Sequence, residues 1–338
     1  MTQIGFGIVG PGYIAGVIAE ALDEASNARL SAVSSRRIEN ARKFTEGRPG
    51  VAAIEGFENL LARPDVDAVY VATPTAAKEE IALAAIAAGK HVLVDKPFRD
   101  RASVLRMTEA AATAGLVFMD ATHFVHHPRT AAFQAAIPGK IGSPRSLHTA
   151  FYFPFSDRAN IRFDPKQEPM TALGDMAWYS MRAVVEYLRP EGAVTKAVVV
   201  PEHDAETNAI VRASGLIAFE DGRVSTFDVG YTAGTIVMDL QLLGTTGVLQ
   251  MDDFVLDWES SSVFKASGDK VGYVHRTGMA TRKDLSFVPT PPRIAQEAAM
   301  IEDFATLVAS GDARERAAHA EATAKTQGYL DSLWASMG

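Results

Sequence analysis

The chain has 338 residues, a net charge of −8 and no cysteine. The length allows two domains with separate cores, the acidic balance argues against a nucleic-acid partner, and the lack of cysteine excludes disulfides and thiolate chemistry. No apolar stretch is long enough to span a bilayer and no signal peptide is visible, so we expect a cytoplasmic protein with no membrane partner.

The first element carries a nucleotide-binding pattern. An apolar strand over residues 4–9 breaks into a G-x-G-x-x-A turn at residues 10–15, and an Ala-rich helix follows. Gly10 permits the tight turn, Gly12 lets a pyrophosphate approach the backbone, and the helix start offers free N–H groups at Tyr13 and Ile14. We therefore predict a dinucleotide site on these four residues, the alternative being a purely structural turn.

The second strand, residues 30–34, bears on the choice of cofactor. It ends at Ser35-Arg36-Arg37, where an NAD-preferring fold would place a carboxylate for the ribose hydroxyls. Two guanidinium groups and a hydroxyl suit a 2′-phosphate instead. We predict that NADP is favoured over NAD, although the arginines also fit the solvated start of a helix.

The remaining elements up to residue 123 alternate in the βαβ manner, which predicts a doubly wound parallel sheet. Strands at 68–72, 91–94 and 116–119 are separated by helices at 79–88 and 102–114. Ligands of open α/β sheets bind at the carboxyl ends of the strands. We therefore expect Thr73, Pro74, Lys96 and Pro97 to contact the cofactor, in a dinucleotide-binding domain of residues 1–123.

In residues 124–338 the apolar pattern changes to long, alternating strands, which predicts an α+β substrate domain with a large open, mostly antiparallel sheet. A helix is expected at 173–188 and two more at 294–309 and 317–337, the last two free to pack back on the first domain. Alternating strands are expected at 146–153, 193–200, 208–219, 223–231, 236–243 and 247–252. The open face of the sheet is expected to form a homodimer or homotetramer through apolar side chains at Ile217, Phe219, Val224, Phe227 and Val229.

Three residues are candidates for catalysis. Lys96 follows a parallel strand, and Asp175 and Tyr179 are four residues apart on one face of a predicted helix. A phenol can exchange a proton with a substrate oxygen while hydride moves to or from a nicotinamide, and an adjacent ammonium favours the phenolate. Taken singly, Lys96 also suits a surface charge, Tyr179 a core aromatic and Asp175 a helix cap.

At these motifs the chain resembles the glucose–fructose oxidoreductase, inositol dehydrogenase and rhizopine-catabolism family (Gfo/Idh/MocA), over nearly its whole length. Residues 7–15 and 69–74 resemble family segments, and so do residues 88–97, with Asp95 where the family usually has Glu. The stretch from 175 to 179 is similar to the tyrosine form of the family's D-x-G-x-H/Y helix. Lys78 departs from the family, which often has His there, and a glycine cluster expected before the helix is absent.

The resemblance implies that Lys96 is the catalytic lysine, Asp175 the carboxylate that orients the substrate, and Tyr179 the proton donor or acceptor. His123, at the domain crossover, is a further candidate for the substrate pocket beside these three residues. A metal site at His123, His126 and His127 is not expected, because no acidic residue lies at helical spacing from them.

We thus expect an NADP-dependent oxidoreductase acting on a CH–OH group of a sugar, cyclitol or related polyol. Two alternatives stay open. One is a dehydrogenase of trans-dihydrodiols or other non-sugar alcohols, and the other is a non-catalytic regulator that senses NAD(P).

Overall fold

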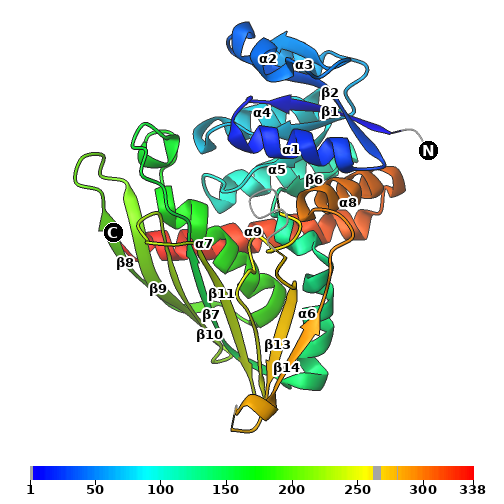
Figure 1. Ribbon diagram of the computed structural model, residues 1–338. Helices are drawn as coiled ribbons and strands as arrows, with labels where there is room; N and C mark the ends of the chain where they lie inside the picture. The colour runs from blue at the N-terminus through cyan, green and yellow to red at the C-terminus, as the bar shows by residue number, and fades with distance from the viewer. Residues whose placement is uncertain (1–2, 262–267, 280) are drawn as a thin grey trace. The chain divides into compact units, whose positions relative to one another are not determined.

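The computed structural model describes residues 3–261, 268–279 and 281–338, and these form two compact units (Figure 1). The first unit contains the chain up to His126 and also Glu297–Ala324. The second contains His127–Gln296 and Lys325–Gly338. The chain therefore leaves the first unit, builds most of the second, returns to the first, and ends in the second.

The first unit is built on a parallel sheet of six strands in the order β3-β2-β1-β4-β5-β6. The predicted doubly wound parallel sheet is thereby confirmed. Its strands are β1 (Ile4–Val9), β2 (Ala28–Ser35), β3 (Ala52–Glu55), β4 (Ala68–Val71), β5 (His91–Val94) and β6 (Phe118–Asp120). Because β1 pairs with both β2 and β4, the chain reverses its winding direction there, and open α/β sheets bind ligands at such a point.

Helices flank this sheet because their apolar residues face its buried strands, as Ile18 and Leu22 of α1 show. The ring of Phe304, from the C-terminal part of the sequence, packs against the ring of Phe6 on β1, with the ring centres 5.4 Å apart. The helices are α1 (Tyr13–Glu24), α2 (Ile38–Thr45), α3 (Phe57–Leu61), α4 (Thr75–Ala87), α5 (Arg101–Ala114), the 3₁₀ turn η1 (His123–His126), α8 (Gln296–Ser310) and the first part of α9 (Ala313–Ala335).

The second unit is built on an eight-stranded sheet in the order β14-β13-β12-β11-β7-β10-β9-β8. Neighbouring strands are antiparallel except for β7 and β10, which run parallel. The strands are β7 (Pro144–Tyr152), β8 (Val194–His203), β9 (Ile210–Phe219), β10 (Val224–Gly230), β11 (Val237–Gly244), β12 (Val248–Met251), β13 (Gly272–Arg276) and β14 (Leu285–Pro289). The sequence pattern predicts six of these eight strands and misses the last two.

Helix α7 packs on one face of this sheet, against β7, β9 and β10 (Figure 1). Thr149 of β7 bonds to Ser180 of α7, so Thr149 marks the covered face. The other helical segments of this unit are α6 (Pro128–Lys140), η2 (Ile161–Phe163), the single π turn η3 (Val184–Leu188) that continues α7 (Thr171–Ala183), and η4 (Arg282–Asp284).

The prediction that five apolar side chains lie on the open face of the sheet is wrong for four of them and right for Val224, which the register places opposite α7. Ile217, Phe219, Phe227 and Val229 are buried within the single chain, and Val224 is half-buried. The register pairs Phe227 with Thr149, which places it on the face that α7 covers. The alternation of a strand shows which residues share a face, but not which face a helix covers.

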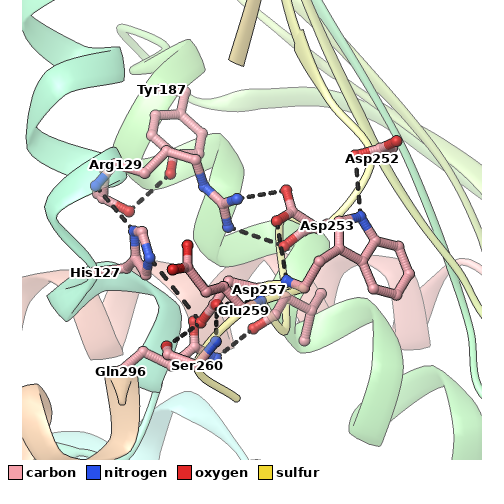
Figure 2. Close-up of polar contacts among 12 residues, drawn as sticks. His127, Arg129, Tyr187, Asp252, Asp253, Asp257, Glu259, Ser260 and Gln296 are labelled. Atoms are coloured by element: carbon pink, nitrogen blue, oxygen red, sulfur yellow. Dashed lines mark hydrogen bonds and ion pairs between the residues drawn. The ribbon is translucent and has the colours of Figure 1, made fainter. Parts of the chain in front are cut away.

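A buried polar network ties the start of α6 to the segment that follows β12 (Figure 2). The guanidinium of Arg129 pairs with the carboxylate of Asp253 and donates to its backbone carbonyl at 2.9 Å. His127 caps α6, because its Nδ1 accepts the backbone N–H of Arg129 at 2.9 Å, and its Nε2 lies 4.0 Å from Oδ2 of Asp257. Burial, and then the nearby Arg129, lower the pKa of His127 to about 3.

No described helix combines the length and the apolar composition that a membrane-spanning segment requires.

Candidate active site

The turn after β1 leaves room for a ligand at the start of α1. Gly10 has a φ of +97°, and a Cβ there would lie 2.8 Å from the carbonyl oxygen of Ala72, so the turn requires glycine. A Cβ at Gly12 would meet nothing within 4 Å, and Gly12 gives α1 no side-chain cap. The first N–H groups of a helix have no partner inside it, so this helix end suits a pyrophosphate.

The two residues after Gly12 form the first turn of α1. Tyr13 is 77% exposed, and Ile14 is half-buried. Their backbone N–H groups belong to the uncapped end of the helix, while the Tyr13 ring extends into solvent. The backbone N–H groups of this turn, and not its side chains, therefore form the part that suits an anionic ligand.

The end of β2 carries positive charge and no carboxylate. The Ser35 hydroxyl accepts the backbone N–H of Arg37 at 3.4 Å, and the side chains of Arg36 and Arg37 are exposed. Helix α2 begins directly afterwards, without a side-chain cap. Both guanidinium groups are thus open to an anionic group at the carboxyl end of β2.

The ends of β4 and β5 contribute the other predicted cofactor residues. Thr73 and Pro74 follow β4, and the Oγ1 of Thr73 is buried with no hydrogen-bond partner in the described part of the chain. A buried hydroxyl in this state suits a ligand atom. Lys96 and Pro97 follow β5, the strand next to β4, at the same edge of the sheet. Lys96 is half-buried and Pro97 is buried. The first unit therefore gathers all of its predicted cofactor residues along one edge.

Asp175 and Tyr179 lie one turn apart on α7 in the second unit. The Tyr179 ring is buried and packs edge-on against Phe151 of β7 at 5.3 Å. Asp175 lies in the second turn of the helix, so it is not the cap of α7. Both residues share a helix face, as their spacing predicts.

Asp175 is held in place by partners of its own. Its Oδ2 accepts the Nε–H of Arg162 at 2.7 Å and the hydroxyl of Tyr231 at 3.2 Å. The guanidinium carbon of Arg162 lies 4.5 Å from the centre of the Phe155 ring, a cation–π contact. Burial, and then the negative charge of Asp175, raise the pKa of Tyr231, so Tyr231 stays a neutral donor to the carboxylate.

The three neighbouring histidines take separate places. His123 is buried in η1, and Nδ1 of His126 lies 2.7 Å from Oδ2 of Asp303. His127 caps α6, as described above. Within the described ranges, no group of three or more His, Cys, Asp or Glu side chains is arranged to hold a metal ion.

Sequence reasoning missed two functional candidates. Arg162 has no motif around it, and only its contact with Asp175 identifies it. Lys78 stands out in the sequence as a departure from the resembled family, but nothing there shows that its side chain turns inward. In the structure Lys78 is 3% exposed, and its ammonium donates to the backbone carbonyl of Lys96.

Two family models match the chain in succession. Residues 4–122 match an oxidoreductase family with an NAD-binding Rossmann fold, and residues 131–250 match the GFO/IDH/MocA C-terminal domain. The chain belongs to the Gfo/Idh/MocA oxidoreductase family. The two models cover the parallel sheet and most of the strands of the second unit, so the resemblance read from the sequence motifs is confirmed.

Individual relatives within this family act on sugars and related compounds. The chain is 32% identical over 234 residues to a dTDP-3,4-didehydro-2,6-dideoxy-alpha-D-glucose 3-reductase of Actinomadura kijaniata, covering 69% of each chain. It is 32% identical, over 46% of its length and 47% of the relative's, to the NADP(+) scyllo-inositol 2-dehydrogenase IolU of Bacillus subtilis. A crystal structure of a 3-ketoreductase from A. kijaniata with NADP and TDP-benzene matches with a TM-score of 0.84 and 28% identity, covering 99% of this chain and 98% of the other.

Proposed function

We propose that this protein is an NADP-dependent oxidoreductase that transfers a hydride between the nicotinamide and a carbinol or carbonyl carbon of a sugar, cyclitol or related polyol. The observation that carries the proposal is the carboxyl edge of the parallel sheet. Along that edge lie the open end of α1, the paired arginines after β2 and Lys96 after β5. Relatives whose names specify a sugar or an inositol, and NADP, support the same assignment.

Each cofactor residue has a defined task in this proposal. The N–H groups at the start of α1 would bind the pyrophosphate, and Arg36 and Arg37 with Ser35 would bind the 2′-phosphate. The Thr73 hydroxyl and the backbone at Pro74 and Pro97 would line the path to the nicotinamide. NADP, when bound, supplies or accepts the hydride.

The proposed catalytic residues are Lys96 of the first unit and Asp175 and Tyr179 of the second. Tyr179 would exchange a proton between its phenol oxygen and the substrate oxygen, as general acid in reduction and general base in oxidation. The Lys96 ammonium would stabilise the phenolate and the oxyanion. Asp175, fixed by Arg162 and Tyr231, would orient a substrate hydroxyl, and His123 is proposed as a further substrate contact.

The chemistry is tested by replacing the proton donor. Tyr179→Phe should lower kcat by about 10²–10⁴-fold, the usual share of general acid–base catalysis, and leave NADP affinity unchanged. Tyr152→Phe is the matched control, because Tyr152 is a half-buried tyrosine of β7 with no role in the proposed site. The assay follows NADPH absorbance with keto sugars, their dTDP-linked forms and inositols.

The proposal fails if the native protein turns over none of these substrates although it binds NADP, a result that would favour a regulator. It also fails if Tyr179→Phe keeps native kcat, since His123 would then be the next acid–base candidate.

We also propose that the protein assembles into a homodimer or homotetramer through the sheet of the second unit. The strand register places Val200, Leu243 and Phe287 on the face opposite α7. These side chains are 69%, 44% and 47% exposed, so this face presents apolar groups that a second copy of the chain could cover.

A further inference from the structure

The lysine at position 78 is buried in a place that does not favour a lysine. It lies in the first turn of α4, where the helix dipole disfavours a positive charge. Its side chain is also among the buried polar groups of the first unit, and an ammonium is costly to bury unless it is hydrogen-bonded. Neither packing nor helix stability explains a lysine at this position. The explanation must therefore lie in the hydrogen bonds that its ammonium makes.

The Lys78 ammonium binds the backbone on both sides of the proposed catalytic lysine's peptide bond. Its Nζ donates to the carbonyl oxygen of Lys96 at 2.9 Å and to that of Pro97 at 2.9 Å. It also donates to the Thr75 hydroxyl at 3.4 Å, and that hydroxyl donates to the Pro97 carbonyl at 3.3 Å. The first turn of α4 is therefore fastened to residues 96 and 97 by side-chain donors.

These carbonyls lie beyond the end of the sheet. Strand β5 ends at Val94, and the last backbone bond to the neighbouring strand is from Asp95 N–H to the Val71 carbonyl at 3.1 Å. Downstream, Phe98 is anchored in the core against the ring of Phe118. The Lys96 side chain thus branches from a backbone stretch that is fixed at Asp95 and at Phe98. The carbonyls of this stretch are oriented by Lys78.

We propose that Lys78 is a positioning residue for Lys96. By holding the carbonyls of residues 96 and 97, Lys78 fixes the direction in which the Lys96 side chain leaves the carboxyl edge of the sheet. Because a misplacement of about 1 Å can cost about 10²-fold in rate, losing these bonds should slow the chemical step. The inference rests on the proposed function for Lys96, and its test includes a measurement that does not depend on it.

The chain offers a matched control at Lys90. The Lys90 ammonium also donates to two backbone carbonyls, those of Arg63 at 3.0 Å and Val66 at 2.8 Å. Lys90 precedes β5, however, so these bonds lie at the amino edge of the same sheet. Lys78→Met and Lys90→Met therefore each remove two ammonium–carbonyl hydrogen bonds, one pair at each end of β5.

The first measurement is hydrogen exchange of the Asp95, Lys96 and Phe98 amides in the protein without substrate. Lys78→Met should speed their exchange by about tenfold or more, and Lys90→Met should leave it unchanged. This result is independent of any activity. If Lys78→Met leaves the exchange of this segment at its native rate, Lys78 does not fix the backbone and the proposal is wrong.

The second measurement is kcat with the substrate found in the panel above. Lys78→Met should lower kcat by about 10–10²-fold with the KM for NADP(H) within threefold, while Lys90→Met stays near native and Lys78→Arg recovers part of the loss. The double variant Lys78→Met/Lys96→Met should be no slower than Lys96→Met alone. Faster exchange with native kcat, or fully additive losses, would make Lys78 a structural residue only and overturn the proposal.

Absence of turnover in the native protein with every substrate would instead refute the proposed function. The exchange result would then still decide whether Lys78 fixes the segment that carries Lys96.

Discussion

At the scale of single residues, we propose that the arginines after β2 carry the cofactor preference. Both side chains are exposed, so any contact they make with a phosphate competes with water. A charge-assisted hydrogen bond is nevertheless worth about 1.5–3 kcal/mol net. This is enough to separate two cofactors that differ in one phosphate group.

We predict that Arg36→Ala/Arg37→Ala weakens NADP binding by about tenfold or more and changes NAD affinity by less than threefold, because only NADP carries the 2′-phosphate. Isothermal calorimetry with both cofactors measures this directly. Arg42→Ala/Lys43→Ala, which removes the same charge from the last turn of α2, is the control. Equal affinity of the native protein for NAD and NADP would contradict the assignment.

The sequence predicts the type of each candidate residue better than its surroundings. Lys96, Asp175 and Tyr179 can be found because they follow a strand or share a helix face. The partner of Asp175 cannot, because Arg162 is brought to it by a loop with no periodic pattern. The sequence also does not show that the Lys78 side chain points inward, because its acceptors are backbone carbonyls of another segment.

At the scale of secondary-structure elements, α6 depends on a histidine as its cap. His127 accepts the N–H of Arg129 through Nδ1, so the neutral ring carries its proton on Nε2, toward Asp257. The folded protein holds this ring neutral, with a pKa of about 3. In the unfolded chain the same group binds a proton near pH 6.5.

We predict that this difference makes the native protein lose stability as the pH falls below about 6.5, since the unfolded state then binds the extra proton. His127→Asn keeps an N-cap acceptor and does not titrate. The destabilisation caused by His127→Asn should therefore shrink by about 2 kcal/mol between pH 7.5 and pH 5. Urea unfolding at both pH values measures it, and a destabilisation that is the same at both would refute the neutral, buried histidine.

The elements themselves were predicted unevenly, for physical reasons. Parallel strands of the first unit such as β4 are buried on both faces and appear as uninterrupted apolar runs, which are easy to recognise. Short segments such as β3, β13 and β14 have half-buried or exposed residues and give no comparable signal. The choice of the covered sheet face depended on α7, and no strand pattern contains that information.

At the scale of the whole molecule, the proposed assembly rests on exposed apolar side chains opposite α7. We predict that light scattering gives the mass of a dimer or tetramer at micromolar concentration, and that Leu243→Glu lowers this mass because it introduces a charge into the interface. Met279→Glu is the control, since Met279 is 88% exposed outside the strands. A monomeric mass for the native protein would refute the assembly.

The parallel pairing of β7 with β10 also bears on how the chain folds during synthesis. Strand β7 lies in the middle of its sheet, between β10 and β11, yet it ends at Tyr152 while β10 begins at Val224. A nascent chain must therefore expose both edges of β7 until much later strands emerge, and such distant pairings form slowly. Unpaired strand edges invite aggregation, so the ribosome-bound protein is most vulnerable after β7 has emerged and before β11 is complete.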